Sequence, residues 1–100
     1  MRALEEYQEE LNELCKKYHV DALYVFGSFA DGAARMNSDM DFLVSFKELS
    51  IEQYTDSYFD LHEALEKLYG RRIDLVTVNS LSNPYFMESV ESTKQLLYAA

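Results

Sequence analysis

The sequence predicts a fold of the α/β (α+β) class, in which helices pack on a small three-stranded mixed sheet. Short apolar segments rich in strand-forming residues occur three times, and they alternate with longer segments of helical periodicity. The chain has 100 residues, 48% of them hydrophobic, which suits one compact domain over residues 1–100. The expected order is helix, strand, strand, helix, strand, helix.

The first predicted helix covers residues 2–18, because apolar residues recur there at steps of three and four. Its apolar stripe consists of Leu4, Tyr7, Leu11, Leu14 and Tyr18. Acidic residues lie early in this segment and Lys16-Lys17 late, which complements the helix dipole. Residues 22–26 form a short apolar run that stops at Gly27, and this pattern predicts a buried strand.

The middle of the chain is expected to form a turn, a strand, a long helix and another strand. Residues 27–38 contain two of the three glycines and fit a turn with a short helix, and the second strand covers 40–46. The long helix ends at Gly70, a typical residue just after a helix. Its apolar stripe consists of Ile51, Tyr54, Tyr58, Leu61, Leu65 and Leu68. The third strand is predicted over residues 72–78.

The last expected element is a helix over residues 85–98, beginning after Asn83-Pro84. Proline is well tolerated in the first turn of a helix. This helix would bury Phe86, Val90 and Leu97. Exposed apolar residues on the two terminal helices would also allow a homodimer.

Composition and charge exclude several classes of protein. The formal net charge is -9, from 18 acidic and 9 basic side chains, so nonspecific binding to nucleic acid is not expected. Cys15 is the only cysteine, which excludes an internal disulfide, and we expect it to be a buried structural thiol. The acidic N-terminus does not resemble a signal peptide, and no apolar run approaches the ~20 residues of a membrane span. We therefore expect a cytoplasmic protein.

Three aspartates lie in or beside predicted strands, where aspartate is uncommon: Asp39, Asp41 and Asp74. Alternation along a strand puts Asp39 and Asp41 on one face, about 7 Å apart. Like charges so placed repel each other unless a cation bridges them, and magnesium prefers such oxygen ligands together with phosphate oxygens. Asp74, from a neighbouring strand, would complete a site for two metal ions.

The expected phosphate-binding element is Gly27-Ser28, directly after the first strand. Glycine lets the backbone approach a phosphate closely, and the Ser28 hydroxyl can donate a hydrogen bond to it. If residues 28–34 open a helix, its free amide groups also point at the anion.

Each of these features has a simpler structural interpretation when it is taken alone. A Gly-Ser pair is usually only a turn, and Asp-x-Asp often caps the start of a strand. Asp74 alone would most simply pair with Arg71 or Arg72. His19 and His62 lack metal-ligand spacing and are expected at the surface or in helix packing. The combination of the three features at their spacing is what indicates a function.

Residues 27–44, GSFADGAARMNSDMDFLV, resemble the signature of the DNA polymerase β nucleotidyltransferase superfamily. That pattern is Gly-Ser, ten residues, and then Asp-x-Asp followed by apolar strand residues. Asp74 resembles the third metal-binding carboxylate of that family, which follows a helix and lies on the next strand. The resemblance covers residues 20–80, includes the order of the elements, and implies a polymerase β-like nucleotidyltransferase fold.

One residue departs from the family pattern. The small members carry arginine where this chain has Asp31. An acid there disfavours a triphosphate unless its side chain points to solvent, and either Arg35 or Arg71 would supply the missing positive charge. The departure leaves the fold prediction unchanged and bears on the activity.

The resemblance implies a minimal nucleotidyltransferase that acts as the antitoxin of a HEPN-type toxin and transfers AMP from ATP to a tyrosine of that toxin. It implies that Asp39 and Asp41 bind two magnesium ions, and that Asp74 binds one of them and takes the acceptor proton. Gly27, Ser28 and Arg35 would bind the nucleotide. Two alternatives remain open. One is an inactive module that neutralises its partner by contact, and the other is a nucleotidyltransferase for a small hydroxylated molecule.

Overall fold

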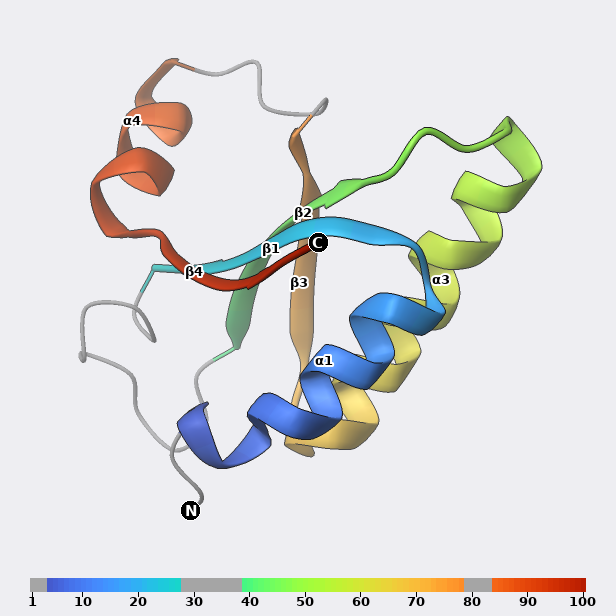
Figure 1. The fold of residues 1–100 in the computed structure, drawn as a ribbon. Coiled ribbons are helices and arrows are strands. Elements are labelled where there is room, and N and C mark those ends of the chain that lie inside the picture. Colours follow the sequence, from blue (N-terminus) through green and yellow to red (C-terminus); the bar gives the residue numbers. More distant parts are fainter. Residues whose placement is uncertain (1–3, 28–38, 79–83) are drawn as a thin grey trace.

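The computed structural model describes residues 4–27, 39–78 and 84–100 of the chain (Figure 1). The elements, in chain order, are η1 (Leu4–Tyr7), α1 (Gln8–Lys17), β1 (Val20–Phe26), β2 (Met40–Phe46), α3 (Ile51–Tyr69), β3 (Ile73–Thr77), α4 (Pro84–Thr93) and β4 (Gln95–Ala99). The predicted strand at 40–46 is confirmed at both ends. The strand predicted at 22–26 begins two residues earlier, and the one predicted at 72–78 is one residue shorter at each end.

The four strands form one mixed sheet in the order β3-β2-β1-β4. β1 pairs antiparallel with both β2 and β4, whereas β2 and β3 are parallel. Parallel neighbours need a crossover connection, and α3 supplies it between β2 and β3.

Helices cover the two faces of the sheet unequally (Figure 1). On one face, α1 and α3 pack against inward-facing strand residues in the larger core cluster. Its helical members are Leu11, Cys15, Leu61 and Leu65. On the other face, a smaller cluster joins Phe26 and Leu43 to Val90 of α4. Strand alternation therefore assigns neighbouring residues to different faces, and this decides where the acidic residues of β2 and β3 point.

The ends of α3 follow from its sequence. Ser50 accepts a hydrogen bond from the backbone of Gln53, whose side chain accepts one from the Ser50 N–H, so the two residues form a capping box. Gly70 ends the helix in the left-handed conformation, with φ of 66°. Ile51, the first residue of the helix, is 86% exposed and therefore does not belong to the buried stripe as predicted.

The prediction of a final helix up to residue 98 and of a three-stranded sheet is wrong. Helix α4 ends at Thr93, and the following residues pair with β1 as a fourth strand. The sequence QLLYA has the apolar side chains for either structure. β4 pairs with the edge of β1 that β2 leaves open, and so supplies partners for the backbone groups of that edge. Val90 is buried as expected, Leu97 is half-buried from β4, and the Phe86 side chain lies outside the description.

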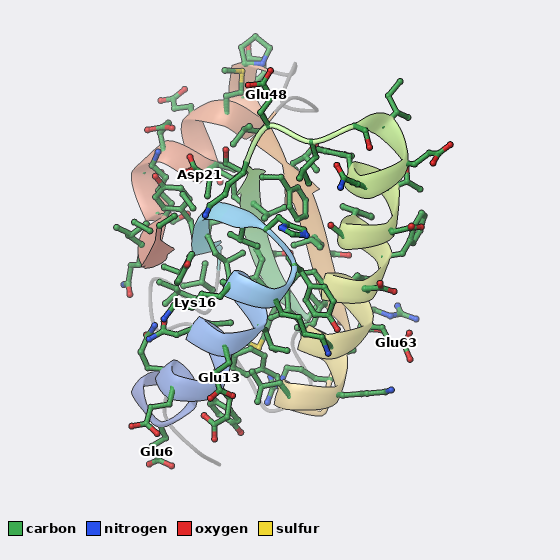
Figure 2. All side chains as sticks on the ribbon, turned by 45° about the vertical axis from the view of Figure 1, so that its right-hand side comes forward. Glu6, Glu13, Lys16, Asp21, Glu48 and Glu63 are labelled. Atoms are coloured by element: carbon green, nitrogen blue, oxygen red, sulfur yellow. The ribbon has the colours of Figure 1, made fainter. Side chains whose placement is uncertain are left out.

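The acidic residues lie mainly on the outside of the molecule. Glu6, Glu13 and Glu63 project from the helices into solvent (Figure 2). Cys15 is fully buried, as expected, and burial raises the pKa of its thiol to about 12. None of the helices in the described part of the chain has the length and apolar character that a membrane crossing requires.

Candidate active site

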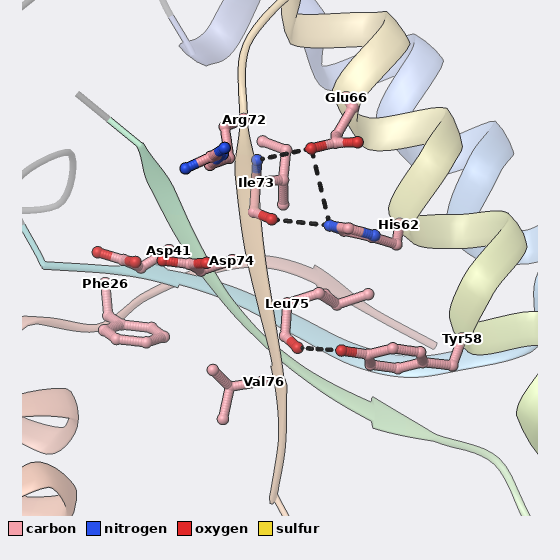
Figure 3. Close-up of a pocket in the computed structure, with 10 residues that line it drawn as sticks. All are labelled: Phe26, Asp41, Tyr58, His62, Glu66, Arg72, Ile73, Asp74, Leu75 and Val76. Carbon is pink, nitrogen blue, oxygen red and sulfur yellow. Dashed lines mark hydrogen bonds and ion pairs between the residues drawn. The ribbon is translucent and has the colours of Figure 1, made fainter. Parts of the chain in front are cut away.

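Asp41 and Asp74 face each other across the parallel strands β2 and β3. The register pairs them directly, and their neighbours Met40, Phe42 and Ile73 point into the larger core. Strand alternation therefore turns both carboxylates to the opposite face of the sheet, where Figure 3 shows them side by side. The apolar residues around each aspartate thus fix the direction of its side chain.

Burial and the neighbouring carboxylate of Asp74 raise the pKa of Asp41. Its pKa is raised from 3.8 to about 6, first because burial disfavours the charged form. The negative charge of Asp74, a hydrogen bond with its side chain and the charge of Asp39 add to the effect. A site of this kind favours either a shared proton or a cation that neutralises the carboxylates.

Gly27 lies directly against Asp41. Its φ is +73°, and a Cβ atom at this position would lie 2.6 Å from Oδ2 of Asp41, which is closer than real contacts allow. The Gly27 N–H donates a hydrogen bond of 3.1 Å to Oγ1 of Thr93, and that hydroxyl donates to the Ser89 carbonyl at 2.8 Å. Helix α4 therefore holds the glycine in place, and only glycine fits there.

A pocket of about 520 Å³ opens beside the two carboxylates and extends around the edge of β3 (Figure 3). Arg72 lines it together with Asp41 and Asp74, so a positive charge lies at the same opening. The other lining residues are Phe26, Tyr58, His62, Glu66, Ile73, Leu75 and Val76. The pocket has room for part of a substrate on the carboxylate side of the sheet.

The structure brings together three of the predicted site residues, Gly27, Asp41 and Asp74. Asp39 is exposed and directly precedes β2. The remaining predicted residues, Ser28, Asp31, Arg35 and the helix expected after Gly27, lie outside the described residues. Thr93 was not predicted, because it is 66 positions from Gly27 and no local pattern links the two.

The described residues suit a hard divalent cation. Within residues 4–27, 39–78 and 84–100, no group of three or more His, Cys, Asp or Glu side chains is placed to hold a metal ion. Two carboxylates nevertheless lie side by side, and burial together with the charge of Asp74 raises the pKa of Asp41. Magnesium sites commonly use one or two protein carboxylates and take their remaining ligands from substrate phosphates and water. The donor set therefore fits magnesium bound together with a nucleotide.

Comparison with known proteins identifies the family of this chain. Residues 9–100 match the family described as polymerase beta, nucleotidyltransferase. The chain belongs to this nucleotidyltransferase family. A relative from Methanocaldococcus jannaschii, provisionally named a protein adenylyltransferase, is 37% identical over 102 residues, which cover 98% of this chain and 99% of the relative. The protein adenylyltransferase MntA of Thermococcus cleftensis is 38% identical over 87 residues, which cover 83% of this chain and 85% of MntA.

Solved structures share the fold of this nucleotidyltransferase. A toxin–antitoxin structure with AMP-PNP aligns at a TM-score of 0.70 and 21% identity, covering 93% of this chain and 73% of that chain. The complex of tri-AMPylated Shewanella oneidensis HEPN toxin with MNT antitoxin aligns at a TM-score of 0.65 and 17% identity, covering 96% and 72%. The predicted polymerase β-like fold is confirmed, with four strands in the sheet.

Proposed function

We propose that this nucleotidyltransferase is a magnesium-dependent protein adenylyltransferase, which transfers AMP from ATP to a tyrosine hydroxyl of a HEPN-type toxin. The register pairing of Asp41 with Asp74, beside Gly27, carries the proposal. The names of the relatives support the reaction, and the AMPylated toxin bound to a protein of the same fold supports the acceptor. The reaction would take place in the cytoplasm, where ATP is made and used.

The residues have distinct roles in this proposal. Asp39, Asp41 and Asp74 would hold the magnesium ions, which when bound neutralise charge on the phosphates of ATP. Gly27 leaves room beside Asp41, while Ser28 and Arg35 would contact the phosphates. The acceptor oxygen forms a bond to the α-phosphorus, the bond from that phosphorus to the bridging oxygen breaks, and pyrophosphate leaves. Asp74, which is exposed to the pocket, would take the proton of the acceptor hydroxyl.

A transfer assay tests this function. The protein is incubated with magnesium, ATP labelled in the α-phosphate and the HEPN-type protein encoded beside it. The control is an Asp39→Asn/Asp41→Asn variant. Label on the partner that is lost with the variant supports the proposal. Tight binding of the two proteins without label in either sample would overturn it.

One residue favours a second function, a module that neutralises its partner by contact alone. Asp31 replaces an arginine of the family pattern and adds a negative charge close in sequence to the phosphate-binding residues. The same assay separates the two functions, because a contact module protects the cell from the toxin without modifying it. The double variant would then neutralise the toxin as well as the original protein does.

A further inference from the structure

Strand β3 lies at one end of the sheet order, and three side chains of α3 bind its outer edge (Figure 3). The hydroxyl of Tyr58 donates a hydrogen bond of 2.6 Å to the carbonyl oxygen of Leu75. Nε2 of His62 lies 2.7 Å from the carbonyl oxygen of Ile73, and because a carbonyl only accepts, this nitrogen carries the proton. The Ile73 N–H donates to Oε2 of Glu66 at 3.2 Å.

The spacing of these side chains matches the spacing of the strand. Tyr58, His62 and Glu66 are four residues apart, so they lie in a row along one side of α3. Four residues advance a helix by ~6 Å, and two residues advance a strand by ~6.6 Å. Tyr58 and His62 therefore reach carbonyl groups that are two residues apart on β3, while Glu66 binds the N–H of Ile73, the same residue that His62 binds. The Tyr58 and His62 rings also stack, with centroids 6.4 Å apart, which orients both donors.

Asp74 lies between the two strand residues that α3 binds. The carbonyl groups of Ile73 and Leu75 are bonded to α3, while the side chain of Asp74 points to Asp41 on the other side of the sheet. β2 holds one edge of β3, and the row from α3 holds the other. Repulsion between the two ionised carboxylates acts on this edge strand, so the row from α3 opposes a displacement of Asp74.

We propose that Tyr58 and His62 are positioning residues, which fix the backbone on both sides of Asp74 and thereby its distance from Asp41. This inference rests on the proposed function, in which both carboxylates bind magnesium. Partners that orient metal ligands commonly change metal affinity or activity by about tenfold to a hundredfold when they are removed. Neither residue needs to touch the substrate for this effect.

The test compares variants that remove a donor with variants that keep one. Tyr58→Phe removes only a hydroxyl, His62→Leu removes the ring donor, and His62→Gln keeps an N–H of similar reach. Glu63→Gln is the control on the same helix, because Glu63 is exposed and pairs with Lys67 at 3.0 Å instead of with β3. Three quantities are measured for each variant: the affinity for Mn²⁺ in the presence of a non-hydrolysable ATP analogue, kcat and KM for AMP transfer, and Tm.

We expect Tyr58→Phe and His62→Leu each to weaken Mn²⁺ binding and to lower kcat by about tenfold, with a smaller change in KM for ATP. His62→Gln and Glu63→Gln should stay close to the original protein. The inference is overturned if both donor-removing variants keep the original Mn²⁺ affinity. It is also overturned if His62→Gln is as impaired as His62→Leu at an unchanged Tm. A lack of AMP transfer by the original protein would refute the proposed function alone, because Mn²⁺ affinity still tests the positioning.

Discussion

The carboxylate of Asp41 occupies the space that a side chain at Gly27 would need. A Cβ atom there would lie 2.6 Å from Oδ2 of Asp41, and the φ of +73° disfavours any other residue. The two residues come from adjacent antiparallel strands, since Phe26, just before the glycine, pairs with Asp41. The end of β1 thus sets the position of a central carboxylate.

Gly27→Ala tests this relationship, with Gly70→Ala as its matched control. Both glycines have a positive φ, but nothing lies within 4 Å of a Cβ at Gly70. Gly70→Ala should therefore lower the free energy of unfolding by only the conformational cost, about 1–2 kcal/mol, and keep AMP transfer. Gly27→Ala should cost more and abolish transfer. Urea unfolding measures the loss of stability, and the transfer assay measures the loss of activity. Equal effects of Gly27→Ala and Gly70→Ala would contradict a close contact between Gly27 and Asp41.

The raised pKa of Asp41 predicts how stability depends on pH. With a pKa of about 6 in the folded chain and an ordinary value of 3.8, folded Asp41 keeps a proton that the unfolded chain has lost between these values. The contribution of Asp41 to stability therefore falls as the pH rises through this window, and above it the charged group destabilises the metal-free fold. Asp41→Asn should be more stable than the original protein at about pH 8 without metal, and the difference should vanish towards about pH 4. Thermal melts across this range measure it, and a difference that does not change with pH would refute the prediction.

Thr93 should contribute through its hydrogen bond to Gly27. Thr93→Val keeps the shape of the side chain but leaves the Gly27 N–H without this acceptor, so we expect a loss of about 1 kcal/mol or more. Thr93→Ser keeps the hydroxyl and should lose less. Urea unfolding of the two variants measures these two losses. A greater loss in Thr93→Ser would indicate that the methyl group matters and the hydrogen bond does not.

Asp31→Arg should strengthen the binding of ATP, because it restores the charge that the family pattern has at this position. One charge near a phosphate changes an interaction by about 1 kcal/mol at the surface. Asp31→Arg changes the charge by two units, or about 2 kcal/mol, so KM for ATP should fall by about thirtyfold. Glu13→Arg makes the same change of net charge on the exposed side of α1 and serves as the control. An equal fall of KM in both variants would show that only the overall charge matters.

The order of elements up to β3 could be predicted from local patterns, because alternation and helical periodicity are strong in these segments. The strand β4 could not be predicted in this way. Residues 95–99 continue the apolar pattern of the preceding helix, and only the open edge of β1 makes them a strand. Pairing with β1 in the assembled sheet makes residues 95–99 a strand, and the sequence of the segment alone does not show this.

The candidate site, too, could be predicted from the sequence only in part. The ten-residue spacing between Ser28 and Asp39 indicated which residues to examine, and the structure adds the direct pairing of Asp41 with Asp74. The role of His62 could not be predicted, since a spacing of four along a helix is common and gains meaning only when β3 lies beside it. Local sequence thus identifies the chemical groups, whereas their supporting contacts depend on the tertiary structure.

The rate of AMP transfer by Asp74→Asn tests the central claim most directly. Asn keeps the size of the side chain but is a poor base and a weaker metal ligand. We expect a rate at least ~100-fold below that of the original protein, with a Tm no lower than that of the original and label on a tyrosine of the partner mainly in the original sample. A variant that labels the partner at the original rate would contradict the assignment of Asp74, and with it the proposed mechanism.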